Sequence, residues 1–197
     1  MRKIAKQIAE VDRKFAPIIE SAPLCEFGLV EQTSSHFESL VSSVISQQLA
    51  TSAARTINQK FRSATGKVTP ANIMKLDDLQ LRAVGLSGAK SKTIRGLANA
   101  ALEKEIDFKT LHEADDQSVY EKLTALWGIG PWTVDMFMMF QLGRLDIWPT
   151  GDLGVRRGWE KIHKLKEEIT PKQLEVKGGK FEPHRSVVAW YCWRALD

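Results

Sequence analysis

The sequence has 197 residues, enough for one domain or two small interlocked lobes with a buried core. Hydrophobic residues make up 43% and charged residues 26%, ordinary values for a soluble globular protein. The net charge of +4 is compatible with a polyanionic partner, but many basic proteins bind no nucleic acid. Composition therefore excludes unusual classes of protein and leaves the function open.

The cysteines and the pattern of apolar residues indicate which metal sites and which cellular location to expect. Cys25 and Cys192 have no second cysteine at metal-ligand spacing, so ligands for zinc or an iron–sulfur cluster are absent and two free thiols are expected. No apolar run approaches the roughly 20 residues that a membrane span needs. The N-terminus has no signal-peptide apolar region and reads as an amphipathic helix. We expect an intracellular protein without a membrane partner.

Helix signals follow one another along the chain, and strand signals are weak. Apolar periodicity, caps, prolines and glycines predict about ten helices. Their predicted ranges are 2–21, from 36 onward, 51–64, from 70 onward, 78–83, 88–103, 116–126, 131–142, 153–165, from 171 onward, and from 183 to the C-terminus. The sequence predicts an all-α protein.

Several helices have recognisable starts. Ser35 followed by Glu38 predicts a capping box for the helix from 36. Thr69 and Thr170 each stand before a proline, and Asp77 precedes the range 78–83, so all three are predicted N-caps.

Two turns between predicted helices resemble each other. Val84-Gly85-Leu86-Ser87 is similar to Trp127-Gly128-Ile129-Gly130, a similarity that either chance or two related hairpins would explain. In the second turn, two glycines flank one apolar residue and permit a tight reversal. Pro131 then begins a helix whose first amides point outward, as in sites that bind phosphate. The alternative is an ordinary corner between two helices.

The segment after this hairpin extends the pattern. GIGPWT (128–133) followed by LGRLDIWPTGDLGVRRG (142–158) resembles the helix-hairpin-helix/Gly-Pro-Asp superfamily of DNA glycosylases, and within it the 3-methyladenine DNA glycosylase II branch. The resemblance runs from about residue 37 to the C-terminus. Larger relatives add an N-terminal β-rich domain, so the resemblance implies a compact form here.

The resemblance implies a fold and its division. We expect a helix-hairpin-helix glycosylase fold of two interlocked helical lobes with the active-site cleft between them. One lobe would comprise 36–142, with the hairpin motif at about 116–142. The other would comprise 1–35 and 143–197 and carry the catalytic loop.

In this family an aspartate at the position of Asp152 is the catalytic carboxylate. Breaking an N-glycosidic bond builds positive charge on the deoxyribose, which a nearby carboxylate stabilises, and the same group can orient the attacking water. The alternative for Asp152 is an N-cap of the helix from Leu153, and the two roles are compatible. Asp146 is a rival carboxylate that we interpret as a solvated loop residue.

The reaction type also follows from the resemblance. Members that cleave the DNA strand through a Schiff base carry a lysine just after the hairpin, where this chain has Trp132. Members of the endonuclease III type carry four C-terminal cysteines for an iron–sulfur cluster, and this chain has only Cys192 there. We expect simple hydrolysis that leaves an abasic site.

The segment VISQQLATSAA resembles the family's turn between two helices. It implies that Leu49 fills the space left by the extruded base, with Gln48 beside it in the minor groove. The alternative places Leu49 in the core of its helix.

Tryptophans are frequent, and two match family pocket residues: Trp132 and Trp193, with Met136 one turn after the first. Trp127, Trp159 and Trp190 are interpreted as core. Purines alkylated at N3 or N7 are cations that stack on such rings, for roughly 0.5–2 kcal/mol each, and they leave without a general acid.

The remaining contacts are predicted at the two hairpins. Ser87, Lys90, Gly128, Gly130 and Thr133 are the predicted DNA-binding residues. Basic side chains that could follow the phosphates are Lys90, Lys92, Arg95, Arg156 and Arg157, while Arg185 could equally be structural.

The family often holds a sodium or potassium ion in the hairpin through carbonyls. The matching positions here are Thr124, Leu126 and Ile129, and we expect no other cofactor.

The predicted partner is duplex DNA with damaged bases, bound by a monomer. Two alternatives remain: a glycosylase for a neutral lesion such as uracil, hypoxanthine or ethenoadenine, and a DNA-binding module without chemistry. If the protein is only a DNA-binding module, Asp152→Asn would retain all of its biological activity.

Overall fold

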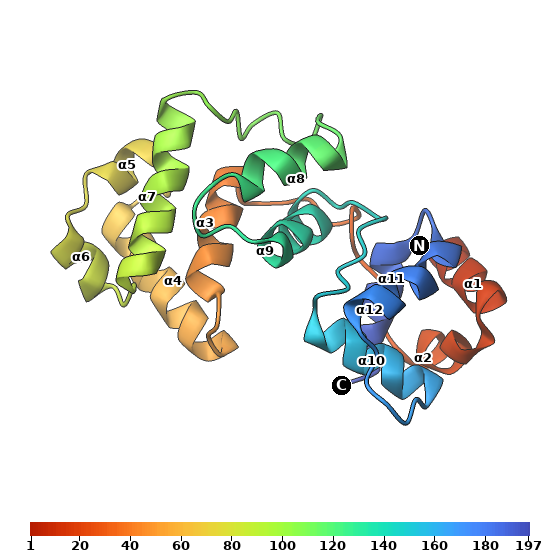
Figure 1. The fold of residues 1–197 in the computed structure, drawn as a ribbon. Helices are drawn as coiled ribbons and strands as arrows, with labels where there is room; N and C mark the ends of the chain where they lie inside the picture. The colour runs from red at the N-terminus through yellow and green to blue at the C-terminus, as the bar shows by residue number, and fades with distance from the viewer. The chain divides into compact units, whose positions relative to one another are not determined.

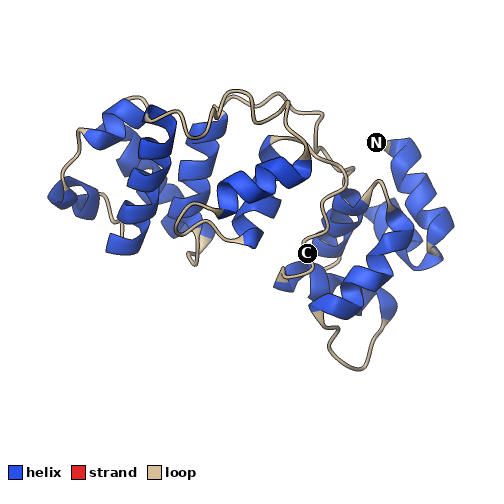
Figure 2. Ribbon diagram, turned by 45° about the horizontal axis from the view of Figure 1, so that its top comes forward, coloured by secondary structure: helices blue, strands red, loops and turns tan.

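The computed structural model describes residues 1–197, apart from the side chain of Thr51. Helices joined by loops make up the described chain, and no strand occurs within it (Figures 1 and 2). The all-α prediction is confirmed. Among the described residues, no helix combines the length and apolar character that crossing a membrane requires.

The chain divides into two compact units. Unit 1 comprises Met1–Glu31 and Met138–Asp197, and unit 2 comprises Gln32–Phe137. The helices of unit 2 are α3 (His36–Ser46), α4 (Thr51–Thr65), α5 (Pro70–Met74), α6 (Asp78–Ala83), α7 (Gly88–Leu102), α8 (Asp116–Thr124) and α9 (Pro131–Met136). The helices of unit 1 are α1 (Arg2–Val11), α2 (Ala16–Ser21), α10 (Leu153–His163), α11 (Pro171–Gly178) and α12 (Arg185–Arg194).

The core of unit 2 is built around α3, which packs against both α4 and α7 (Figure 1). Its buried face has the helical spacing read from the sequence. The side chains of that face are Phe37, Leu40, Val41, Val44 and Ile45. Ile94 and Leu97 of α7 are also fully buried, and Phe37 meets Phe108 edge to face with 5.4 Å between ring centroids. This packing holds α3 in the core of unit 2.

The core of unit 1 is aromatic. Phe15 makes edge-to-face contacts with Trp159, His163 and Phe181. α10 lies directly on α12, and a Cβ on Gly158 would overlap the backbone carbonyl of Cys192. The absence of a side chain at Gly158 is therefore what allows the two helices that carry the candidate carboxylate site to approach so closely.

The predicted helix caps are largely confirmed. Thr69, Asp77 and Thr170 accept hydrogen bonds from backbone N–H groups in the first turns of α5, α6 and α11. The capping box predicted at Ser35 is half right. The Ser35 hydroxyl accepts from the Glu38 N–H at 3.2 Å, but the Glu38 carboxylate pairs with Arg62 at 3.0 Å.

Several predicted helices were too long. The range 2–21 is broken at Asp12, whose extended backbone ends α1 and whose side chain accepts from the Lys14 N–H at 3.1 Å. The range 116–126 ends at Thr124. The range 131–142 contains α9 followed by a π-helical segment, Phe137–Gln141.

The last helix begins at Arg185 rather than at Pro183. Pro183 lies in the loop before the helix, whose N-cap is His184, and its peptide bond with Glu182 is cis.

Candidate functional site

The two hairpin turns of unit 2 share three features in the same order. Gly85 and Gly128 have positive φ angles of 101° and 83°. Each is followed by a buried apolar residue, Leu86 or Ile129, and then by the N-cap residue of α7 or α9. The similarity noted in the sequence therefore corresponds to a shared succession of residues, although the hydrogen bonds differ: the Leu86 N–H donates to the Leu81 carbonyl and the Ile129 N–H to the Leu126 carbonyl.

Gly128 is fixed by packing as well as by its φ angle. A Cβ at this position would overlap the Oγ1 of Thr93, a buried residue of α7. The hairpin backbone consequently lies directly against α7. A side chain at residue 128 would push the turn away from the helix.

The turn after α3 exposes a leucine. The backbone of Gln47 leaves the helix with ψ of 132°, and Gln48 has a positive φ of 56°. Leu49 follows with 38% of its surface exposed. The alternative that Leu49 belongs to the core is therefore wrong, and its role as a wedge stays a prediction.

Gln47 joins this turn to the hairpin, a contact that the sequence did not reveal. Its Nε2 donates to Thr133 Oγ1 at 3.0 Å and to the Gly128 carbonyl at 3.4 Å. Thr133 is buried, so it is placed to hold the hairpin together. Only the polarity of Gln47 beside Leu49 hinted at a role.

Lys90 points into unit 2. Its ammonium donates to the carbonyls of Ile45 and Gln47, at 2.8 Å in each case. Burial lowers the pKa of Lys90. The phosphate contact predicted for Lys90 therefore competes with two protein carbonyls.

Trp127 was interpreted as a core residue, and this is wrong. Its ring is 54% exposed, and the Lys92 ammonium lies 4.2 Å from the ring centroid. Arg95, also on α7, is held by the Leu76 carbonyl at 2.6 Å and by Asp78 at 3.1 Å.

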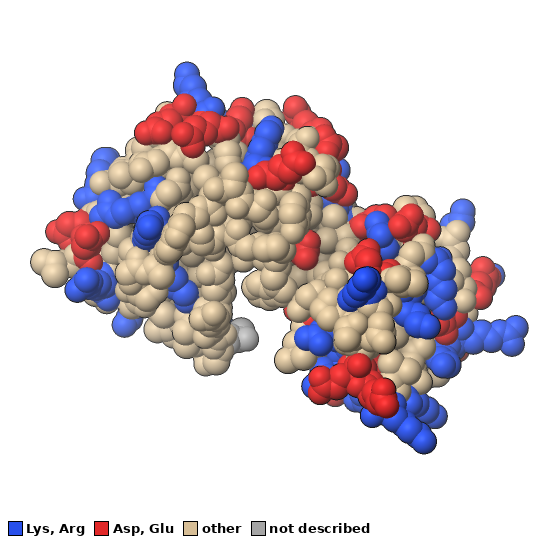
Figure 3. Space-filling model, in the orientation of Figure 1, with Lys and Arg blue, Asp and Glu red and all other residues tan. Residues whose placement is uncertain are grey.

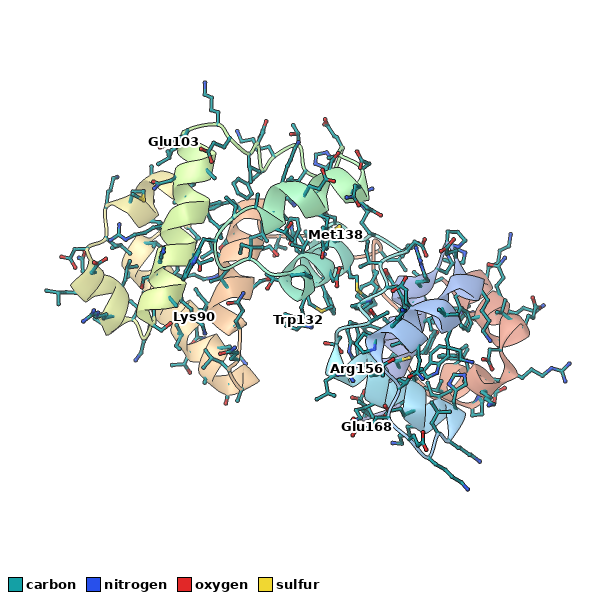
Figure 4. The ribbon with its side chains drawn as sticks, in the orientation of Figure 1. Lys90, Glu103, Trp132, Met138, Arg156 and Glu168 are labelled. Carbon is teal, nitrogen blue, oxygen red and sulfur yellow. The ribbon has the colours of Figure 1, made fainter. Side chains whose placement is uncertain are left out.

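The predicted pocket residues of unit 2 lie on α9. Trp132 stands in its first turn with 46% of its surface exposed (Figure 4). Met136 lies one helical turn later and is partly buried. The two side chains thus form one apolar face of α9.

Asp152 caps α10 in unit 1. Its Oδ1 accepts from the Val155 N–H at 2.8 Å and from Trp193 Nε1 at 2.9 Å. The N-cap interpretation is confirmed, and it does not compete with a chemical role. Two donors on one oxygen fix the plane of the carboxylate.

The surroundings of this carboxylate contain two residues that the sequence did not single out. The ring of Phe140, in the π-helical segment, is stacked on Trp193 with centroids 5.8 Å apart. A Cβ on Gly154 would come within 2.9 Å of the Trp193 ring and 3.1 Å of the Asp152 carboxylate. Glycine at this position leaves room for the bond between Trp193 and Asp152. Its place in the LGRLDIWPTGDLGVRRG motif was the available signal.

Asp146 is not a solvated loop residue. Its carboxylate accepts from Arg185 Nε at 2.9 Å and from Arg185 Nη2 at 2.8 Å. This bidentate pair ties the loop before Asp152 to the start of α12, so Arg185 is structural. The prediction for Asp146 failed because its partner lies far along the chain.

The basic residues after Asp152 also have protein partners. Arg157 pairs with Glu160 at 2.9 Å and with Glu168 at 2.6 Å. Arg156 makes a long contact of 3.5 Å with the Ile169 carbonyl.

Cys25 and Cys192 are buried free thiols, as expected. Burial raises the pKa of Cys25 to about 11 and also raises that of Cys192. The described residues contain no cluster of three His, Cys, Asp or Glu side chains able to hold a metal ion.

The predicted cation ligands lie where carbonyls are available. α8 ends at Thr124, so the carbonyls beyond it lie at the negative end of a helix. The Leu126 carbonyl accepts from the Ile129 N–H at 3.1 Å and keeps a second lone pair. The donor set fits a hard monovalent cation.

Comparison with known proteins gives a consistent picture. Residues 41–183, which include both hairpins and Asp152, match the family described as HhH-GPD superfamily base excision DNA repair protein. The chain is 34% identical over 163 residues to DNA-3-methyladenine glycosylase 1 of Schizosaccharomyces pombe, with 80% of this chain and 71% of that protein covered.

Solved structures resemble the fold closely. A DNA-3-methyladenine glycosidase from Bacillus halodurans aligns with a TM-score of 0.84 at 34% identity, over 98% of this chain and 88% of that one. The Schizosaccharomyces pombe 3-methyladenine DNA glycosylase Mag1, in complex with abasic DNA, aligns with a TM-score of 0.87 at 28% identity, over 97% and 95%.

Proposed function

The chain belongs to the HhH-GPD superfamily of base excision DNA repair proteins, and from this membership we propose that it is a DNA glycosylase that hydrolyses the N-glycosidic bond of alkylated purines. The observation that carries the proposal is the carboxylate of Asp152, held at the start of α10 by Val155 and Trp193 inside the matched range. The names of the similar proteins support 3-methyladenine and related bases as substrates.

Asp152 is the proposed catalytic residue. As the bond to the base lengthens, positive charge grows on the sugar, and a fixed negative group nearby lowers the energy of that state. Its two hydrogen bonds mean that little reorganisation is needed when the charge appears. The same carboxylate is suited to orient the water that attacks the anomeric carbon.

The aromatic side chains support an alkylated purine as the substrate. Trp132, 46% exposed on α9, and Trp193, stacked on Phe140, are the proposed partners of the base. A cationic purine is attracted to such rings and is already a good leaving group. The base therefore departs without a dedicated general acid.

The proposed reaction is monofunctional. Trp132 occupies the position after the hairpin where lyases of this superfamily carry a lysine, so no amine stands there to form a Schiff base. Water is the nucleophile, and the product is an abasic site.

The proposed partner is duplex DNA. The amides of the two hairpins, at Ser87, Gly128 and Gly130, are suited to hold phosphates without reading sequence. Leu49, with Gln48 beside it, is the proposed wedge that replaces the extruded base. We propose that the protein acts on DNA inside the cell and that it does so as a monomer.

The charge distribution of unit 2 is compatible with DNA bound on the side of the hairpins. Figure 3 shows carboxylates gathered along one edge of the unit, where the segment 103–116 supplies several of them. The hairpins lie away from that segment along α7 (Figure 1). We propose that DNA meets the hairpin side and that a monovalent cation held by the carbonyls of Thr124, Leu126 and Ile129 stiffens the hairpin.

The test is incubation with duplex DNA methylated at random, followed by mass identification of the released bases. The proposal predicts release of 3-methyladenine and 7-methylguanine and DNA that carries alkali-labile abasic sites without strand cleavage. Release of hypoxanthine, ethenoadenine or uracil in preference would contradict the substrate class. If the folded protein released no base, the proposal that it is a glycosylase would be contradicted.

A further inference from the structure

Lys90 caps the end of α3 from a different helix. The last carbonyls of a helix have no partners within it, and they lie at the negative end of its dipole. The Lys90 ammonium, from α7, bonds the carbonyls of Ile45 and Gln47 at 2.8 Å each. One cation therefore satisfies two carbonyls at the point where the chain leaves the helix.

The turn that begins there is strained and short. Gln48 has a φ of 56°, a left-handed conformation uncommon for a residue with a side chain. The Leu49 N–H donates to the Ser46 carbonyl at 3.3 Å. The backbone reverses within these residues and leaves Leu49 exposed, so something outside the turn must stabilise it.

A second tie comes from the side chain of Gln47. Its Nε2 reaches Thr133 Oγ1 on α9 at 3.0 Å. The turn is thus fixed to α7 by the Lys90 ammonium and to the hairpin helix by Gln47. Figure 4 shows Lys90 on α7 near the end of α3.

We infer that Lys90 and Gln47 are positioning residues that hold the turn 47–49 in the shape that presents Leu49, and that Lys90 does not bind phosphate. The inference rests on the proposed function, in which Leu49 enters the space of the extruded base. A side chain that must displace a nucleotide is effective only when its backbone is held in advance.

The first test compares Lys90→Met with the unchanged protein, since methionine keeps the apolar stem and removes the ammonium. In single-turnover assays at saturating alkylated duplex, base release is expected to fall about tenfold. The dependence of undamaged-duplex binding on salt is expected to keep its slope. A phosphate contact would instead reduce that slope by about 0.9 and leave release at saturation unchanged, and this result would overturn the inference.

Lys92→Met is the matched control. Lys92 stands on the same helix, with its ammonium over the exposed ring of Trp127. This variant measures what removal of a surface ammonium from α7 does to the salt slope in the same assay.

A double-mutant cycle separates positioning from a general loss of stability. Leu49→Ala removes the side chain that the turn presents, so Lys90→Met is expected to add little to its effect on base release. If the two effects multiply fully, Lys90 does not act through Leu49 and the inference fails.

Amide hydrogen exchange tests the same point without any glycosylase activity. Lys90→Met, and independently Gln47→Leu, are expected to speed exchange of the Leu49 amide while thermal unfolding of each variant stays cooperative. Unchanged exchange in both variants would overturn the inference. Failure of the proposed function would appear separately, as absence of base release by the unchanged protein.

Discussion

Trp193 Nε1 donates a hydrogen bond of 2.9 Å to Oδ1 of Asp152, the same oxygen that accepts from the Val155 N–H. The ring expected to line the base pocket is therefore also a support of the candidate catalytic carboxylate. Phe140 stacks on that ring, and Gly154 leaves space for it. Aromatic packing and carboxylate orientation are coupled at one side chain.

Trp193→Phe tests this coupling, because phenylalanine keeps an aromatic face and loses the donor. A hydrogen bond to a charged group is worth about 1.5–3 kcal/mol, so base release at saturating DNA is expected to fall about 10–100-fold. Binding to undamaged duplex should remain. Single-turnover release and fluorescence anisotropy measure the two quantities.

Trp190→Phe is the control for that variant. Trp190 lies on the same helix and donates its Nε1 to the Pro23 carbonyl at 3.1 Å, away from Asp152. Release within about twofold of the unchanged protein is expected. Equal losses in the two variants would mean that the bond to Asp152 has no special part.

Gly128→Ala is expected to destabilise the protein by about 2–3 kcal/mol, because its φ is positive and a Cβ would overlap Thr93. Weaker DNA binding should accompany the loss, since the hairpin would move from α7. Urea unfolding and anisotropy measure both.

Gly96→Ala provides a control of opposite sign. Gly96 lies within α7, and a Cβ there would meet open space. The free energy of unfolding is expected to rise by about 0.5–1 kcal/mol, because alanine loses less conformational freedom than glycine when the helix forms. Stability of Gly128→Ala equal to that of Gly96→Ala would refute the packing argument.

Asp12 links the start of unit 1 to α10 and to the segment after α11. Its Oδ2 lies 2.9 Å from Lys180 Nζ and 3.0 Å from His163 Nε2. Burial alone would raise the pKa of Asp12, but hydrogen bonds from Lys180, His163 and the Lys14 N–H lower it from 3.8 to about 2.

Asp12→Asn is therefore expected to cost about 2 kcal/mol at neutral pH. A carboxyl whose pKa is lower in the folded state stabilises that state above its unfolded pKa. This contribution declines as the pH falls from 3.8 to about 2. Urea unfolding at pH 7, 4 and 2.5 measures the decline. A difference between the variant and the unchanged protein that stays constant over this range would contradict the expectation.

Glu10→Gln is the matched control. Glu10 is 3.8 Å from Lys6 and both side chains are largely exposed. The free energy of unfolding of this variant should stay within about 0.5 kcal/mol of that of the unchanged protein at every pH.

The features predictable from sequence were those with local causes. The positive φ of the hairpin glycines, the proline that begins α9 and the caps at Thr69, Asp77 and Thr170 are set by neighbours within a few residues. Asp152 was found because its cap position and the surrounding motif agree. These signals gave the all-α fold and the candidate carboxylate.

The features that were missed depend on contacts distant in sequence. Asp146 meets Arg185 across 39 positions, and Lys90 meets Ile45 across 45. Trp127 was interpreted as core because aromatic residues at helical spacing usually are, but the packing of the helices leaves it exposed, with the Lys92 ammonium over its ring. No pattern of spacing contains such information, because helix packing decides it.

The central claim is that the negative charge of Asp152 promotes departure of the base. Asp152→Asn tests it most directly, because the amide oxygen still accepts from Val155 and Trp193 and the cap is retained. The measurement is single-turnover release of alkylated purines from duplex DNA. We predict that release is lost while DNA binding is kept or tightened. Release by Asp152→Asn at the rate of the unchanged protein would contradict the claim.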